Sequence, residues 1–172
     1  MSELTFSHLT ASYKDLVVSW LHKPHVAEWF HGDGLNSTLN SIEQYLAGKA
    51  DLYDHWLGFC DGVPFAFLMT SLIEPDPEDH LNKWHDPNQK AMTLDLLIGE
   101  ENYLGKGLSV PMIQQFITQH LSDADVVFID PEATNTKAIH VYQKAGFVKV
   151  DEFIASWHPV PHWLMRCVRD KL

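Results

Sequence analysis

Two acidic residues stand where an apolar strand ends or is interrupted. Asp95 lies inside the alternating apolar run of residues 92–98, which is typical of a strand. An unpaired carboxylate there costs several kcal/mol, so we expect Asp95 to face a polar cleft or a partner, or else solvent from an edge strand. Asp130 follows the short apolar run 126–129, at the carboxyl end of a strand, where α/β sheets place ligand sites. Capping of a loop or helix is the alternative for Asp130.

A glycine turn follows the first of these strands. Gly105-Lys106-Gly107 leads into a helix that starts near Leu108. Glycines let a ligand approach the backbone, and the free N–H groups and dipole of a helix start favour an anion. The turn lacks the third glycine of a dinucleotide fingerprint and the ending of a P-loop. It therefore predicts a site for a phosphate-bearing ligand, with a plain glycine turn as the alternative.

A second motif lies about thirty residues downstream, with the spacing Asn-x-x-Ala-x-x-x-Tyr-x-x-x-Gly-Phe. Its members are Asn135, Ala138, Tyr142, Gly146 and Phe147. Together with the glycine turn, this motif resembles the acetyl-CoA-binding core of the GNAT superfamily of N-acetyltransferases. The resemblance covers roughly residues 95–150. It implies an α/β fold with a central mixed sheet flanked by helices, and acetyl-CoA as co-substrate.

The resemblance also implies a role for individual residues. The coenzyme A pyrophosphate would be bound by the backbone amides of Leu104, Gly105, Lys106, Gly107, Leu108 and Ser109. Asn135 would contact the pantetheine or adenosine part, and Tyr142 would lie near the thioester sulfur. In this family two strands splay apart and pantetheine pairs in the gap, so the N–H of Leu97 would meet the thioester carbonyl. Asn102 replaces the usual Gln or Arg of the loop, which binds phosphate mainly through its backbone.

The chemistry of acetyl transfer gives two of these residues independent reasons. An alkylammonium has a pKa near about 10, so the attacking amine must lose a proton, which a carboxylate such as Asp95 can accept. The leaving thiolate needs a proton or a hydrogen bond, which the Tyr142 hydroxyl can supply, and the oxyanion needs a fixed donor. Without the family context, Tyr142 is equally a core aromatic. No covalent enzyme intermediate is required.

The rest of the chain narrows the resemblance. Residues 20–33 resemble the Trp-Leu-x-x-x-His-(Val/Ile)-x-x-Trp-Trp segment near the start of bacterial aminoglycoside 6′-N-acetyltransferases. Further matches run in the same order through most of the chain: Asp86-Pro87, Leu94-Asp95, Leu104 to Leu108, Asp130-Pro131 and Ile139 to Phe147. This resemblance makes Asp95 the general base or amine-positioning carboxylate. It makes Asp130 a contact for a cationic ring, and it places Trp29 and Asp33 in the substrate cleft.

One departure from that family lies before the last strand. Many of its members carry an acidic residue there, where this chain reads Trp-His-Pro-Val-Pro-His at residues 157–162. The N-terminal pattern also resembles acyltransferases that acetylate N-hydroxylysine in siderophore assembly. A third reading is a coenzyme A-binding sensor without turnover, although a sensor would need neither Asp95 nor Tyr142.

The elements that must position these residues follow from periodicity and turn signals. Four helices are predicted. The first covers residues 13–21, with Ser12 as its cap and Pro24 as its stop, and the second covers residues 39–46 and is closed by Gly48. The third starts at Leu108 and would bury Leu108, Met112, Gln115 or Phe116, and Gln119; the fourth is capped by Asn135 or Thr136 and ended by Gly146. The predicted strands are 56–60 and 64–73 around the Asp61-Gly62 turn, 92–98, 126–129, 147–155 and 162–168. This order predicts a mixed α/β sheet with one parallel crossover, in a single domain over residues 1–172.

Composition limits the partners. The 172 residues carry 12 Lys+Arg and 23 Asp+Glu, a formal net charge of -11, which disfavours nucleic acid and anionic membranes and favours a cationic small molecule. The two cysteines, at 60 and 167, suit a reduced compartment, and no apolar stretch approaches a membrane span. We expect a cytoplasmic monomer or homodimer. The Pro- and acid-rich residues 74–80 are predicted to form a long loop.

The chain has 11 histidines, which are common metal ligands. Close pairs occur at residues 22/25, 80/85 and 158/162. Prolines at positions 24, 159 and 161 break the local helical geometry, and no pair has a nearby third ligand in sequence. The sequence therefore predicts no metal site.

Overall fold

The computed structural model describes residues 1–49, 52–76, 78 and 80–169. The strands within this part of the chain are β1 (Leu4–His8), β2 (Asp54–Cys60), β3 (Val63–Leu72), β4 (Ala91–Ile98), β5 (Val126–Ile129), β6 (Val148–Ile154) and β7 (Pro161–Val168). The α-helices are α1 (Lys14–Leu21), α2 (Pro24–Ala27), α3 (Gly32–Leu46), α4 (Ser109–His120) and α5 (Thr136–Lys144). Short 3₁₀ turns cover Ala11–Tyr13, His80–Trp84 and Glu101–Tyr103.

These seven strands of the described chain form one twisted sheet in the order β1-β2-β3-β4-β5-β7-β6. Neighbouring strands are antiparallel except β4 and β5, which are parallel and connected through α4. A parallel pair needs such a crossover, because the chain must return to the same end of the sheet. The predicted mixed α/β architecture with one parallel crossover is therefore confirmed.

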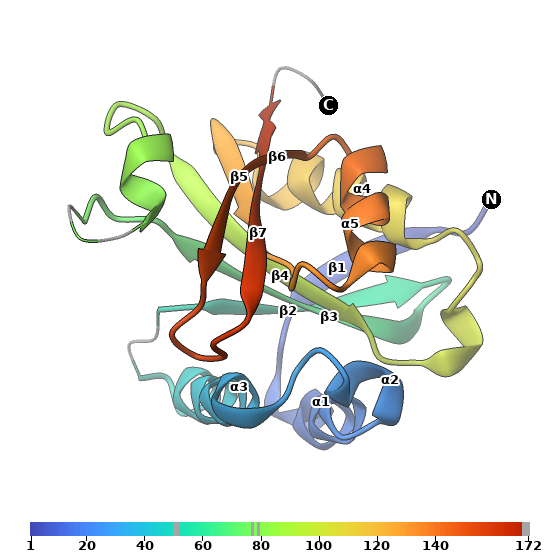
Figure 1. Ribbon diagram of the computed structural model, residues 1–172. Helices are drawn as coiled ribbons and strands as arrows, with labels where there is room; N and C mark the ends of the chain where they lie inside the picture. Colours follow the sequence, from blue (N-terminus) through green and yellow to red (C-terminus); the bar gives the residue numbers. More distant parts are fainter. Residues whose placement is uncertain (50–51, 77, 79, 170–172) are drawn as a thin grey trace.

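The sheet is covered on both faces, as Figure 1 shows: α1, α2 and α3 lie on one side and α4 and α5 on the other. Met112 and Phe116 of α4 and Ile139 of α5 belong to one buried cluster, together with inner sheet residues. Trp20 of α1 and Ile42 of α3 belong to a second cluster on the opposite face. Because both faces of the central strands are buried, β3 reads as an almost continuous apolar run.

Three of the predicted turns and helix ends are confirmed: the Asp61-Gly62 turn, the end of α3 at Gly48 and the cap of α5. Asp61 and Gly62 both have positive φ, 50° and 80°, so they form the tight turn between β2 and β3. Gly48, with φ of 70°, follows the end of α3 in the left-handed conformation that helix ends favour. Asn135 rather than Thr136 caps α5, since its side chain accepts the Ala138 N–H at 3.2 Å.

Two details of the predicted helices are wrong. Ser12 does not cap α1: it lies in the preceding 3₁₀ turn, and its hydroxyl shares a 2.8 Å hydrogen bond with Thr10. The buried residues of α4 are Met112, Ile113, Phe116 and Ile117, so Met112 and Phe116 of the predicted stripe are confirmed and Gln119 is not. Gln119 is exposed, because α4 packs through two pairs of neighbouring residues, 112–113 and 116–117, which lie one turn apart.

Some elements had no sequence signal strong enough to predict them. Strand β1 lies at the sheet edge and buries only Leu4, so its sequence is mostly polar. Helix α3 begins seven residues before Leu39, in a Gly- and polar-rich turn. In the predicted loop 74–80, residues 77 and 79 lie outside the described residues. None of the described helices has the length and apolar character that a bilayer span requires.

Candidate active site

The sheet opens between β4 and β5. Their pairing covers only Ala91 to Thr93 on β4 and Val126 to Phe128 on β5, while β4 continues to Ile98. Parallel strands that separate leave backbone N–H and C=O groups facing the gap, where an extended ligand can pair with them. Two cavities of about 290 and 280 Å³ lie beside this opening.

The two cavities share a wall. The larger one, here called the acidic cavity, is lined by residues that include His31, Asp95, Asp130, Glu132, Trp157 and His158. The smaller one, here called the slot, is lined by residues that include Leu96, Leu97, Ile98, Leu104, Ser109 and Val141. Both are lined by Trp29, Phe30, Leu96, Asn135 and Tyr142. A ligand in the slot can therefore touch a ligand in the acidic cavity.

Asp95 lies on an interior strand, so the alternative of an exposed edge-strand position is wrong. It is paired across β3 with Met69, which places both side chains on the face covered by α1–α3, at the acidic cavity. Burial raises the pKa of Asp95 to about 6. At neutral pH the group is mostly ionised yet a better proton acceptor than an ordinary carboxylate.

Tyr142 projects from α5 and is buried between the two cavities. Its ring packs 6.2 Å from that of Phe147. Burial raises the pKa of the Tyr142 hydroxyl, and the charges of Asp95 and Asp130 raise it further. The hydroxyl therefore keeps its proton at neutral pH and is a hydrogen-bond donor toward the space between the cavities.

The glycine turn has the geometry of an anion cradle. Gly105 and Gly107 have φ of 70° and 72°, and no atom lies within 4 Å of the place where a Cβ would be. Helix α4 starts directly after Leu108, which offers no side-chain acceptor to cap the helix. The first N–H groups of α4 are thus left to a ligand, and the helix dipole favours a negative one.

The other predicted cofactor residues occupy different positions around the slot. Leu97 is buried, pairs with Phe67 on β3, and lines the slot. Lys106 is exposed at the tip of the glycine turn, and Leu108 packs against the main core. Asn135 uses its side-chain oxygen to cap α5, so its side-chain NH₂ group is left to donate to a ligand.

The predicted substrate residues are only partly brought together. Trp29, just after α2, forms the wall that both cavities share. Asp130, directly after β5, lines the acidic cavity with Asp95. Asp33 does not line either cavity: it is exposed in the first turn of α3, where its charge favours the helix start.

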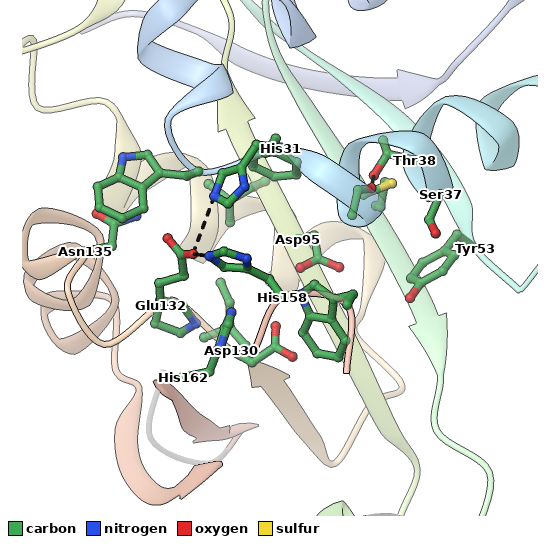
Figure 2. A pocket seen from close by; sticks show the side chains of 18 of the residues that line it. His31, Ser37, Thr38, Tyr53, Asp95, Asp130, Glu132, Asn135, His158 and His162 are labelled. Carbon is green, nitrogen blue, oxygen red and sulfur yellow. Dashed lines mark hydrogen bonds and ion pairs between the residues drawn. The ribbon is translucent and has the colours of Figure 1, made fainter. Parts of the chain in front are cut away.

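Three residues of the acidic cavity were not predicted as a group. Glu132 Oε1 lies 3.0 Å from His158 Nε2 and 3.5 Å from His31 Nε2 (Figure 2). The three come from the β5–α5 loop, the β6–β7 loop and the residue before α3, so no local spacing could reveal them. Glu132 also supplies an acid beside the loop before β7, which itself carries none.

Comparisons with known proteins place this site in a family. The acetyltransferase (GNAT) domain matches residues 12–155. The structure of an aminoglycoside N(6′)-acetyltransferase from Legionella pneumophila is 44% identical, with a TM-score of 0.87 over 96% of this chain and 91% of that one. The type 1 aminoglycoside N(6′)-acetyltransferase of Klebsiella pneumoniae is 26% identical over 137 residues, which are 77% of this chain and 67% of the relative.

A further structure is similar in fold. It is AAC(6′)-Ib in complex with ribostamycin and coenzyme A, at 22% identity and a TM-score of 0.82 over 98% of this chain and 95% of that one. The sheet that opens between β4 and β5, the glycine turn and these matches together define the class: the chain belongs to the GNAT acetyltransferases. It is an acyltransferase, and the relatives named above are aminoglycoside 6′-N-acetyltransferases.

Proposed function

We propose that this enzyme transfers the acetyl group of acetyl-CoA to a primary amine of a cationic small molecule, the 6′-amine of an aminoglycoside. The observation that carries the proposal is the junction of the two cavities, where Asp95 and Tyr142 lie. One cavity has the shape and backbone groups for the thioester donor. The other carries acidic side chains that suit a polycationic acceptor.

Acetyl-CoA is the co-substrate, and the chain offers fitting groups for it. The turn at Gly105 and Gly107 and the uncapped start of α4 would bind the pyrophosphate through backbone N–H groups. The pantetheine arm would extend along the slot beside Leu97, pairing with the free edge of β4. This places the acetyl group at Tyr142, which lines both cavities.

The acceptor would lie in the acidic cavity. Asp130 and Glu132 provide negative charge for ring ammonium groups, and Trp29 provides an apolar wall. Asp95, with its pKa raised to about 6, takes one proton from the 6′-ammonium. A carboxylate that is desolvated in the free enzyme also gains more from a bound cation than an exposed one would.

Bond making and breaking then balance without a covalent enzyme intermediate. The amine nitrogen attacks the thioester carbonyl carbon, and a backbone N–H on the free edge of β4 hydrogen-bonds the oxyanion. The N–H of Leu96 fits this role, because the register that pairs Gly99 N with the Phe65 carbonyl turns the N–H of Leu97 toward β3 and that of Leu96 toward the opening. The carbon–sulfur bond breaks and the Tyr142 hydroxyl hydrogen-bonds the departing thiolate. The nitrogen releases two protons in all: one ends on the coenzyme A thiol and the other leaves through Asp95 to solvent.

A thiol-release screen tests the proposal. Acetyl-CoA is incubated with aminoglycosides that carry a 6′-amine, with matched aminoglycosides that carry a 6′-hydroxyl, with polyamines and with hydroxylamines. We expect turnover with the 6′-amine compounds and at least about 100-fold lower kcat/KM with the 6′-hydroxyl compounds. Preference for hydroxylamines would instead support siderophore-type N-hydroxylysine acetylation. Tight coenzyme A binding without turnover on any amine would support a sensor.

A further inference from the structure

We propose that His31, Glu132 and His158 form a binding site for one transition-metal ion, Zn²⁺ being the ion that this set of ligands fits best. The three side chains each offer one ligand atom, and all these atoms lie within 4.8 Å of one another. Figure 2 shows both imidazoles directed at the same carboxylate. This property goes beyond acetyl transfer, although the site lies in the acidic cavity where the acceptor is proposed to bind, and an ion there would offset part of the charge of Glu132.

Two of the three distances between ligand atoms are close to the value for tetrahedral coordination, and the third, between the two imidazoles, is at most 4.8 Å. Zinc binds imidazole nitrogen and carboxylate oxygen at about 2.1 Å, so two ligands at a tetrahedral angle lie about 3.4 Å apart. Glu132 Oε1 is 3.0 Å from His158 Nε2 and 3.5 Å from His31 Nε2, on either side of that value. Small side-chain rotations would be enough to bring the three atoms around an ion.

Backbone hydrogen bonds hold the segments that carry two of the three ligands, Glu132 and His158. The residues around Glu132 are tied to the start of β7 by hydrogen bonds from Ala133 N to the Pro161 carbonyl and from Trp163 N to the Pro131 carbonyl, both 2.9 Å. The Glu132 side chain is only 11% exposed. The carbonyl of His158 accepts a 2.8 Å bond within its loop. A largely preorganised site loses little conformational entropy when it binds an ion.

The chemistry of the ligands identifies the class of ion. Two imidazoles and one carboxylate suit Zn²⁺, Cu²⁺ or Ni²⁺ rather than Mg²⁺ or Ca²⁺, which prefer oxygen ligands alone. Three protein ligands leave a fourth coordination position for water or another ligand, which here faces the acidic cavity. Asp95 and Asp130, in the same cavity, add negative charge that favours a dication.

Such an ion would connect three separate parts of the chain. His31 precedes α3, Glu132 follows β5, and His158 lies between β6 and β7. The ion would thus fix the acceptor side of the cavity in one arrangement. Without it, the three groups are in contact only through the Glu132 carboxylate, which lies 3.0 Å from His158 Nε2 and 3.5 Å from His31 Nε2.

Calorimetry on the chelator-treated enzyme tests the proposal with Zn²⁺, and Co²⁺ serves as a spectroscopic probe. We expect one saturable site per chain with a dissociation constant of about 10 μM or tighter, and cobalt d–d absorption of the intensity typical of four-coordinate sites. Glu132→Gln and His158→Ala should each weaken binding at least about 100-fold. His140→Ala, which removes an exposed imidazole on α5, is the matched control and should leave binding unchanged.

Thermal unfolding provides a second measurement that does not depend on catalysis. Zn²⁺ should raise the melting temperature of the wild type and of His140→Ala, and should leave that of Glu132→Gln unchanged. Equal melting temperatures of all variants without metal would show that folding is intact. Zinc binding that is equally strong in Glu132→Gln and His158→Ala, or absent from the wild type, would overturn the proposal whatever the acetyltransferase assay shows.

Discussion

Burial raises the pKa of the Tyr142 hydroxyl and the charge of Asp95 raises it further, although the two residues come from different layers of the fold. Asp95 lies on β4, inside the sheet, and Tyr142 on α5, which packs on one face. They meet because β5 is short and stops pairing with β4 at Phe128, so the α5 side chain reaches the opening. The Asp95 carboxylate, which can accept a proton, and the Tyr142 hydroxyl, which stays protonated, are thus held close together, as the proposed acetyl transfer requires.

The first prediction concerns the ionisation of Asp95. Because the carboxylate must be ionised to accept a proton and its pKa is about 6, kcat/KM should fall as the pH drops through 6. Asp95→Asn should lower kcat about 100-fold or more and remove this acidic limb. Asp33→Asn, outside both cavities, is the control and should keep the wild-type profile. An unchanged acidic limb in Asp95→Asn would assign the limb to another group.

The same substitution should stabilise the fold. The pKa of Asp95 is raised on folding from 3.8 to about 6, so the carboxylate opposes folding at neutral pH, and this effect disappears as the pH falls from above 6 to below 3.8. Asp95→Asn should therefore raise the free energy of unfolding at pH 7, by up to about 3 kcal/mol. Urea denaturation at a series of pH values should show this gain shrinking between pH 6 and pH 4. A loss of stability at pH 7 would mean that bound partners hold the carboxylate.

Tyr142→Phe tests whether the hydroxyl acts in the reaction or only packs. In the proposed mechanism the Tyr142 hydroxyl, which its raised pKa keeps protonated, donates a hydrogen bond to the departing thiolate, so its loss should lower kcat about 10-fold or more. The dissociation constant of acetyl-CoA should change little, since the ring remains. Single-turnover measurements separate the chemical step from binding. A change in kcat of less than twofold would assign Tyr142 to the core beside Phe147.

Gly107→Val tests the anion cradle. The φ of 72° strains any other residue, and a branched side chain would fill the space that a pyrophosphate needs. We expect coenzyme A affinity to fall at least about 10-fold in calorimetry. Gly48→Val is the matched control, because Gly48 has φ of 70° and equally open surroundings but lies at the end of α3. Both variants should lose stability, and only Gly107→Val should lose the ligand.

The sequence predicted those parts of the fold whose signals are local. The Asp61-Gly62 turn, the Asn135 cap and the acid inside the strand 92–98 all follow from neighbouring residues, and the structure places each as expected. What the sequence could not show depends on tertiary packing. The shift of the buried stripe of α4 follows from how that helix rests on the sheet.

The candidate site divides in the same way. Asp95 was singled out as an acid inside an apolar strand, Asp130 by its place at a strand end and Tyr142 by the family motif, and the structure brings all three to one cavity. The contact of Glu132 with two imidazoles joins positions 31, 132 and 158, which are far apart in the chain, so only the folded structure reveals it.

The last prediction concerns the link between α1 and the end of β4. Gly99 packs so tightly against Trp20 that a Cβ would stand 2.0 Å from the indole Cδ2, and that indole is fully buried. The indole N–H also donates a 2.7 Å bond to Glu100, next to the segment that leads to the glycine turn. The indole cannot shift to make room for a Cβ at Gly99, because it is fully buried and hydrogen-bonded to Glu100. Gly99→Ala should therefore destabilise the protein by about 2 kcal/mol or more.

Urea denaturation measures this loss, and coenzyme A calorimetry shows whether it extends to the cradle. Gly34→Ala is the control: its Cβ would stand an ordinary 3.5 Å from Trp157, and alanine favours the helix α3. That variant should be as stable as the wild type or slightly more so. If Gly99→Ala were equally stable, β4 and α1 could separate without cost, and the fixed position of the glycine turn would have to come from α4 alone.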